Sequence, residues 1–234
     1  MSRISIGVLQ PGARPVGIGV TGARRGVAMF GGSPQAVIVK SCTPQELAAE
    51  CFCALVADAL SVQAPPCGLV FENGAPLFAS IDVGVPNLMQ QFCVDTANPN
   101  PHELRALVDE LVQWVGFGRL IALDILIRNA DRHPGNLLTD GADYWAIDHG
   151  RTLGLYPYQG HKAYRLAATF ADALVCANIE AGAVSHALTF PVGCEASAGS
   201  ELAAHPVIAG FAQPFAAQVA SRLPALASSI KGLL

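Results

Sequence analysis

The sequence is poor in charge, and no segment of it is strongly basic. Only 14% of the 234 residues are charged, and 14 basic against 18 acidic side chains leave a net charge of −4. Proteins that bind nucleic acid normally present a basic face to the phosphates, so this composition disfavours a nucleic-acid partner. Low charge does not indicate disorder here, because 52% of the residues are hydrophobic and can bury a substantial core.

The cysteines lack the spacing of a zinc site or a disulfide framework. There are seven, an odd number, and no two of them form a C-x-x-C pair. Structural zinc sites usually draw thiolates from such pairs, and disulfide frameworks use even numbers of cysteines. We therefore expect reduced, buried thiols.

The sequence also lacks an uninterrupted apolar run of membrane-spanning character. The longest uncharged stretch, Leu202 to Ser221, contains two prolines, a histidine and two glutamines, whereas a spanning helix needs about 20 mostly apolar residues. The first seven residues run into Gly and Pro without the apolar segment of a signal peptide. We expect a soluble, cytoplasmic protein with no membrane partner.

The first part of the chain alternates β-branched runs with glycine turns, which predicts strands. The predicted extended runs are 15–20, 26–30, 36–40, 67–71 and 77–83. Glu72-Asn73-Gly74 is a hairpin turn between the last two runs. A helix is predicted from Thr43 to about Leu60, because Thr43 and Glu46 form a capping box and Pro44 suits the first helical position.

The second part is mainly helical. Asn and Pro at 98–101 indicate a linker, and helices are predicted at 103–115 and 118–127. Two short extended runs, 137–138 and 144–147, precede an alanine-rich remainder that we expect to be packed helices. The sequence thus predicts an α+β fold in one domain, 1–234, with a small β-rich lobe at about 1–92 and a larger helical lobe at about 100–234.

Oxygen-bearing side chains gather on two loops of the second part. Asp131 and Asn136 stand in an Asp-x4-Asn spacing, and Asp148-His149-Gly150 follows a short strand. Magnesium prefers oxygen ligands and takes few from protein when phosphates supply the rest, which suits Asn136 and Asp148. Asp131 is spaced to orient an acceptor hydroxyl and accept its proton. The preference of Asp, Asn and Gly for turns would explain the composition of either loop alone. It does not explain why both loops occur, in this order, in one chain.

Residues near these loops and upstream of them have more ambiguous patterns. His133 is expected to orient its loop, and Arg132 fits either a structural ion pair or a substrate contact. Lys40 ends an apolar strand ahead of the helix that carries Glu50, a pattern that favours a phosphate contact over a solvated edge lysine. Gly17 to Gly22 matches G-x-G-x-x-G literally, but the motif is a weak signal because no helix follows, as a dinucleotide-binding fold requires. Residues 21–26 fit a hairpin over phosphates or an ordinary surface turn equally well.

The run N-A-D-R-H-P-G-N-L-L with the later A-I-D-H-G resembles the catalytic and metal-binding loops of the HipA-like kinases, relatives of the phosphoinositide kinase group. The upstream A-V-I-V-K, E-L-A-A-E and Pro-Pro break fit the same family, so the resemblance covers about Pro15 to Gly150. It implies a two-lobed protein-kinase-like fold and an ATP- and magnesium-dependent phosphotransferase that acts on a protein Ser or Thr. The roles that it implies are ATP-phosphate contact for Lys40, pairing with Lys40 for Glu50, catalysis for Asp131, and magnesium binding for Asn136 and Asp148.

The chain departs from this pattern in places. Histidine is the middle residue of the Asp-His-Gly triplet, where many kinases have Phe, and no Ala-Pro-Glu follows it. The chain is also much shorter than typical HipA-like kinases, and its last third resembles no family that we can name.

Two other functions stay open. Small-molecule kinases of the aminoglycoside and choline type also contain Asp-x-His-Pro-Gly-Asn, but Asn129-Ala130 stands where that group usually has His-Gly. A nucleotide-binding pseudokinase scaffold would be expected to have lost Lys40, Asp131 or Asp148. All three are present, which favours activity. The acceptor, protein or small molecule, is not determined by these motifs.

Overall fold

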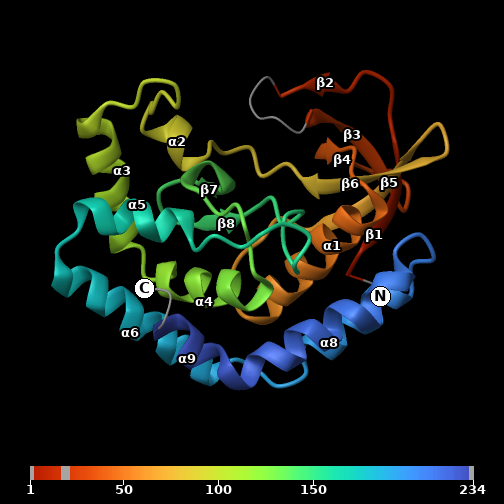
Figure 1. Ribbon diagram of the computed structural model, residues 1–234. Coiled ribbons are helices and arrows are strands. Elements are labelled where there is room, and N and C mark those ends of the chain that lie inside the picture. The colour runs from red at the N-terminus through yellow and green to blue at the C-terminus, as the bar shows by residue number, and fades with distance from the viewer. Residues whose placement is uncertain (1–2, 17–21, 232–234) are drawn as a thin grey trace.

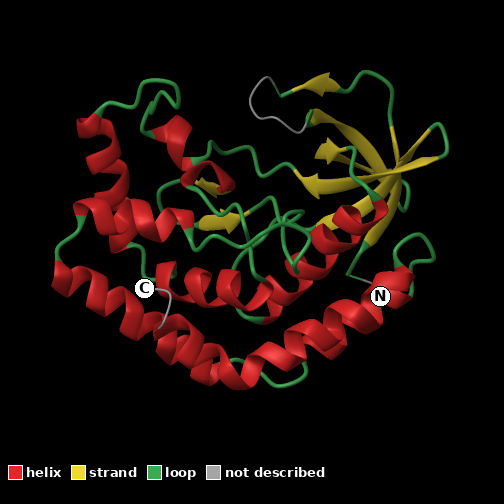
Figure 2. Ribbon diagram, viewed as in Figure 1, coloured by secondary structure: helices red, strands yellow, loops and turns green. Residues whose placement is uncertain are grey.

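The computed structural model describes residues 3–16 and 22–231. It is a mixed α+β structure in which a β-rich N-terminal part is followed by a helical C-terminal part, as the sequence predicts (Figures 1 and 2). The division into two lobes between residues 92 and 100 stays a prediction. The strands of the N-terminal part are β1 (Ser5–Leu9), β2 (Arg14–Pro15), β3 (Arg24–Phe30), β4 (Ser33–Lys40), β5 (Cys67–Glu72) and β6 (Ala75–Ile81).

Five of these strands pair in a closed ring. β1 pairs in parallel with β5 and antiparallel with β3, while β5, β6, β4 and β3 follow one another antiparallel. Alternation along the strands places Val37, Val39 and Ala79 in one small cluster and Phe78 in the main core, as the two-residue period of a strand requires. A Cβ on Gly7 would lie 2.6 Å from the carbonyl oxygen of Met29, so only glycine allows β1 to approach β3 so closely.

Helix α1 (Pro44–Ala59) begins where the capping signals predict. The Thr43 hydroxyl accepts a hydrogen bond from the Glu46 amide at 3.3 Å, and the Thr43 amide donates to the Glu46 carboxylate at 3.0 Å. Most of the helix is buried, because small alanine and cysteine side chains let it pack between the sheet and the C-terminal helices. This position holds Glu50 inside the molecule, 1% exposed.

The remaining elements belong to the helical part. They are α2 (Leu88–Gln91), α3 (Pro101–Gln113), α4 (Phe117–Ile127), η1 (Pro134–Asn136), β7 (Leu137–Thr139), β8 (Tyr144–Ala146), α5 (Lys162–Phe170), α6 (Ala173–Thr189), α7 (Cys194–Ala203), η2 (Ala209–Phe211), α8 (Ala212–Arg222), η3 (Leu223–Ala225) and α9 (Leu226–Lys231). Helices α6 and α9 pack on α4, and α7 and α8 pack on α1 (Figure 1). One hydrophobic core therefore runs from α1 through α4 to the C-terminal helices.

Some expectations from the sequence need correction. Of the extended run expected at 15–20, Pro15 belongs to β2 and Val16 to no strand. Residues 17–20 of that run, and 17–21 of the glycine motif, lie outside the described residues. Arg24 to Gly26, expected in a hairpin, belong to β3. β1 was not predicted, since its five residues carry glycine and little alternation. The seven cysteines are free, but only four of them are buried: Cys42 and Cys176 are half-buried and Cys93 is exposed.

Within the described ranges, no single helix has the length and apolar character to cross a membrane. Helices α6 and α7 meet these criteria only as a pair, and a bend of 68° separates them.

Candidate active site

Lys40, Glu50 and Asp148 meet, although 108 positions of sequence separate the first from the last. The Lys40 Nζ lies 3.2 Å from the Glu50 Oε1 and 3.0 Å from the Asp148 Oδ1. The other Glu50 oxygen, Oε2, accepts a hydrogen bond of 2.7 Å from the main-chain amide of His149. The glutamate of α1 therefore links the lysine at the end of β4 to the Asp-His-Gly loop, the arrangement that the sequence predicts for Lys40 and Glu50.

Burial and charge act against each other in this cluster. Burial lowers the pKa of Lys40, but the carboxylates of Glu50 and Asp148 outweigh it and hold that pKa above its ordinary value. Burial raises the pKa of Glu50, and Lys40 only partly offsets this. For Asp148 burial is again the largest influence, yet the charge of Lys40 lowers the net pKa. The lysine is thus a permanent buried cation beside an ionised Asp148, with 28% of the aspartate side chain exposed.

Asp131 and Asn136 are held in one loop by local hydrogen bonds. The Asn136 Nδ2 donates to the main-chain oxygen of Asp131 at 3.0 Å, and the Asp131 amide donates to the Asn129 Oδ1 at 3.0 Å. His133 orients the turn, as expected, because its Nδ1 accepts from the Gly135 amide at 3.1 Å. This bond orients the Asn136 amide, and its Oδ1, which accepts no hydrogen bond from the described residues, can bind another group.

Arg132 joins the Asp131 loop to the Asp148 loop. Its Nη1 donates to the main-chain oxygens of Asn136 and Ile147, both at 2.7 Å, and the Ile147 amide donates to the Asn136 oxygen at 3.2 Å. Asn136 and Asp148 therefore lie on adjacent backbone segments. Of the two roles left open for Arg132, a structural ion pair and a substrate contact, the structure shows the structural one, because the side chain is fully buried.

A buried carboxylate on α4, Asp124, anchors this arginine, and no sequence motif pointed to it. The Asp124 Oδ2 lies 2.9 Å from the Arg132 Nε and 3.0 Å from the His161 Nε2, and its Oδ1 accepts from the Asn129 Nδ2 at 3.0 Å. Burial would raise the pKa of Asp124, but Arg132 and His161 lower it to about 2. The only sequence signal was an acidic residue within the very apolar run of 117–127, where an unpaired carboxylate would be costly.

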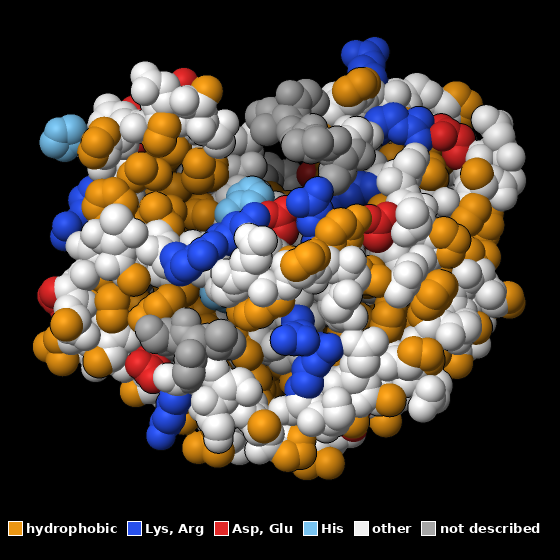
Figure 3. All heavy atoms as spheres, viewed as in Figure 1, with side chains coloured by type: hydrophobic (Ala, Val, Ile, Leu, Met, Phe, Trp, Pro, Cys, Tyr) orange, Lys and Arg blue, Asp and Glu red, His pale blue; other side chains and the backbone are white. Residues whose placement is uncertain are grey.

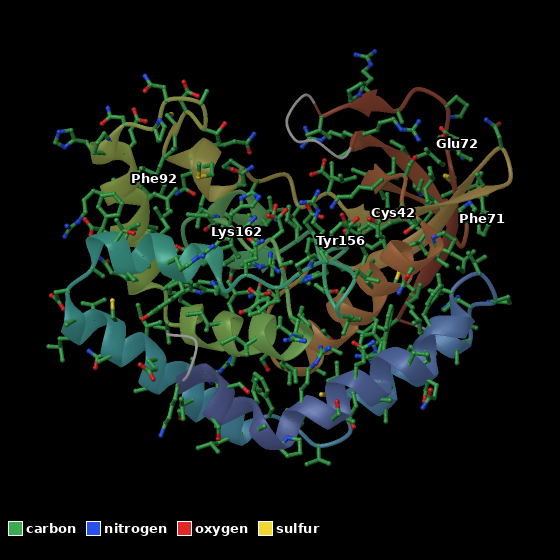
Figure 4. The ribbon with its side chains drawn as sticks, viewed as in Figure 1. Cys42, Phe71, Glu72, Phe92, Tyr156 and Lys162 are labelled. Atoms are coloured by element: carbon green, nitrogen blue, oxygen red, sulfur yellow. The ribbon has the colours of Figure 1, made fainter. Side chains whose placement is uncertain are left out.

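Two further cations, Arg151 and Lys162, lie against Asp131 and were also missed. The Arg151 Nη1 is 3.1 Å from the Asp131 Oδ2, and the Lys162 Nζ donates to the Oδ1. Their side chains are 47% and 40% exposed, whereas that of Asp131 is 19% exposed. Figure 4 shows Lys162 at the start of α5, and Figure 3 shows basic, acidic and histidine side chains meeting around the middle of this face.

The contacts of its neighbours His161 and Ala163 fix the position of Lys162. His161 caps α5 by accepting from the Tyr164 amide at 3.0 Å through Nδ1, while its Nε2 contacts Asp124. The Ala163 amide donates to the Arg132 oxygen at 2.9 Å. The first turn of α5 is thereby tied to the same buried network as the Asp131 loop.

The donor set suits a hard cation that shares its coordination with phosphates. Asn136 and Asp148 offer one amide and one carboxylate group, and magnesium commonly takes only one or two protein ligands. No group of three or more His, Cys, Asp and Glu side chains in the described ranges could hold a metal ion, at this site or another.

No protein-family model matches the chain, and no curated protein matches it in sequence. Its structure is similar to the Helicobacter pylori proinflammatory kinase CtkA, at 13% identity over 97% of both chains with a TM-score of 0.61. It is also similar to HipA from the Shewanella oneidensis MR-1 toxin–antitoxin complex with HipB and operator DNA, at 11% identity over 96% of this chain and 69% of that chain, with a TM-score of 0.60. The predicted likeness to HipA-like kinases is confirmed at the level of fold, and it extends beyond Gly150 into the last third.

Proposed function

We propose that this chain is a HipA-like kinase that transfers the terminal phosphoryl group of ATP to a hydroxyl acceptor, a protein Ser or Thr. The observation that carries the proposal is the convergence of Lys40, Glu50 and Asp148 with the Asp131–Asn136 loop, within a fold similar to the kinase CtkA and to HipA. Fold alone does not define an activity, but these residue types in this geometry are the parts that phosphoryl transfer requires. A two-lobed architecture, with ATP bound between the lobes beside Lys40, belongs to the same proposal.

In this proposal the phosphates of the bound nucleotide would pair with cationic side chains that now pair with carboxylates of the protein. Lys40 would contact the phosphates, with Glu50 keeping its ammonium in place. Asn136 and Asp148 would hold magnesium, which would neutralise phosphate charge and fix the phosphates for in-line transfer. Asp131 would orient the acceptor hydroxyl and receive its proton, and Lys162 and Arg151 would neutralise negative charge on the phosphoryl group as it moves.

Thermal shifts with two matched variants separate the roles of the two aspartates. A ligand that binds only the folded state stabilises it by about 2.7 kcal/mol at a hundredfold excess over its Kd. Asp148→Asn should lose the stabilisation by magnesium-ATP, since it removes a metal ligand. Asp131→Asn should keep most of that stabilisation while phosphoryl transfer collapses. The opposite pattern would reverse the assignment, and no shift in the unmodified protein would rule out ATP as the ligand.

The acceptor class is decided by following labelled phosphate from ATP in a cell lysate. Label on protein Ser or Thr supports the proposal. Label on small molecules alone would instead indicate an enzyme of the aminoglycoside or choline type. Stabilisation by magnesium-ATP without any transfer would indicate a nucleotide-binding scaffold.

A further inference from the structure

A pocket of about 310 Å³ lies beside the segment that follows Asp148-His149-Gly150. It is lined by Arg128, at the C-terminal cap of α4, and by Gly154, Leu155, Tyr156, Pro157 and Tyr158. Pockets that hold small ligands begin at about 300 Å³, so the space suits a small chemical group rather than a nucleotide. None of its lining residues is among Lys40, Glu50, Asp131, Asn136 and Asp148.

Tyr158, in the wall of this pocket, has a buried hydroxyl with no hydrogen-bond partner in the part of the chain that the structure describes. Burial, the largest influence, raises the Tyr158 pKa to about 12, so the hydroxyl remains protonated and can donate. A buried hydroxyl without a partner costs free energy, and native structures rarely leave one unsatisfied. Tyr158 is therefore a neutral donor whose acceptor is not among the described residues.

One arginine, Arg128, lines the pocket, and a second, Arg165, is exposed on α5. The positive charges of Arg128 and Arg165 both act on the Tyr158 ionisation, and neither guanidinium has a hydrogen bond or an ion pair to any residue that the structure describes. The nearby carboxylate, Asp124, is already engaged by Arg132 and His161. In a chain with net charge −4, this is a local excess of positive charge. Guanidinium groups and a hydroxyl donor together match the acceptors of a phosphate or carboxylate group.

The pocket is connected to Asp131 through a single aromatic ring. The Arg151 guanidinium lies 5.2 Å from the centre of the Tyr156 ring, and Tyr156 lines the pocket. The same Arg151 contacts the Asp131 carboxylate at 3.1 Å. The Tyr156 hydroxyl donates to Glu46 at 2.6 Å, which ties this wall to the start of α1. One wall of the pocket is therefore in contact with Arg151, a direct partner of Asp131.

We infer that this pocket binds an anionic group, a phosphate monoester in the first instance, carried by the acceptor substrate close to the hydroxyl that is phosphorylated. This rests on the proposed function for the identity of the carrier, but not for the binding itself. The chain would then prefer acceptors that already bear a phosphate or a carboxylate near the target hydroxyl.

The binding experiment measures inorganic phosphate by isothermal titration in the absence of nucleotide. It is done in a Lys40→Met background, which weakens phosphate binding at the nucleotide site. Arg128→Asn removes the guanidinium and keeps a residue that tolerates the left-handed conformation of this position, φ 52°. Tyr158→Phe removes only the hydroxyl. Arg14→Asn, at an exposed position of the edge strand β2, is the matched control.

We expect Arg128→Asn to weaken phosphate binding about tenfold to a hundredfold, the effect of losing one charge-assisted hydrogen bond. Tyr158→Phe should weaken it a few-fold, and Arg14→Asn should leave it unchanged. Phosphate binding that both pocket variants retain, or its absence from the background protein, overturns the inference.

A second experiment identifies the carrier. Matched serine peptides, each with or without a phosphoserine beside the target serine, are compared as acceptors. Wild type should prefer the phosphorylated member, and Arg128→Asn should lose that preference. Equal use of both members overturns the acceptor assignment and leaves a free phosphate as the ligand. If wild type transfers phosphate to nothing, the proposed function fails while the titration still decides the pocket.

Discussion

The buried ion pair of Asp124 and Arg132 should contribute far more to the free energy of unfolding than an exposed ion pair does. Both side chains are fully buried, and Arg132 also holds the main-chain oxygens of Asn136 and Ile147. Asp124→Asn keeps the shape of the side chain but removes its charge. The variant would leave the guanidinium of Arg132 buried without a counter-ion, and it would weaken the contact to His161.

The magnitude follows from burial. Removing one partner of a buried ion pair typically costs about 3–5 kcal/mol, because the remaining charge is uncompensated. This is a large part of the roughly 5–15 kcal/mol that stabilises a typical domain. The chain offers a matched control in Arg105–Asp109, an i,i+4 pair on α3 with side chains 57% and 49% exposed. Asp109→Asn should cost only about 0–1 kcal/mol, since solvent screens exposed pairs.

Urea denaturation of the two variants gives their free energies of unfolding. Because Asp124 touches several groups, a double-mutant cycle with Arg132→Met tests whether the loss arises from the pair itself. The double variant should be more stable than the sum of the two single losses predicts. A loss for Asp124→Asn as small as that of the surface control, or a coupling free energy near zero, would contradict the proposed importance of this pair.

Other predictions address function, pH and the start of α1. Lys40→Met should abolish most phosphoryl transfer while circular dichroism shows an intact fold. Turnover at the wild-type rate would mean that Lys40 is a solvated lysine at the strand end and does not contact phosphates. Lys162→Met should lower kcat about 10²–10³-fold, a typical cost of losing one charge-stabilising donor, yet keep the thermal shift with magnesium-ATP, whereas Lys162→Arg should recover part of kcat. The pKa of Asp124 is lowered from 3.8 to about 2 in the folded state. The stabilisation that ionised Asp124 gives is therefore present above about pH 4 and lost as the pH falls through about 2. In acid titrations, the difference in free energy of unfolding between wild type and Asp124→Asn should narrow as the pH falls from about 4 to about 2. Thr43→Ala should destabilise the protein by about 0.5–2 kcal/mol in urea, since it removes the cap of α1, and no change would mean that the cap is redundant.

The sequence by itself determined the features that depend on neighbouring residues. The capping box at Thr43 and the Asn73-Gly74 turn are local, so they were predicted where they are observed. The β-branched run that ends at Lys40 is also local, although β4 begins three residues earlier than predicted, at Ser33. The order and spacing of Lys40, Glu50, Asp131, Asn136 and Asp148 predicted which loops carry the chemistry, because each residue is recognisable together with its immediate neighbours. The structure brings Lys40, Glu50 and Asp148 together, and their roles in catalysis stay a prediction.

Only the tertiary structure determined which distant groups satisfy one another. Asp124, Arg132 and His161 come from three separate segments, and nothing local shows that α5 docks where its first turn meets the Asp131 loop. The contact of Lys162 with Asp131 depends on the same docking, as does the pocket beside Tyr158. Burial creates these pairings: once α4 is enclosed in the core, its carboxylate needs a cation, and the chain must deliver one from elsewhere.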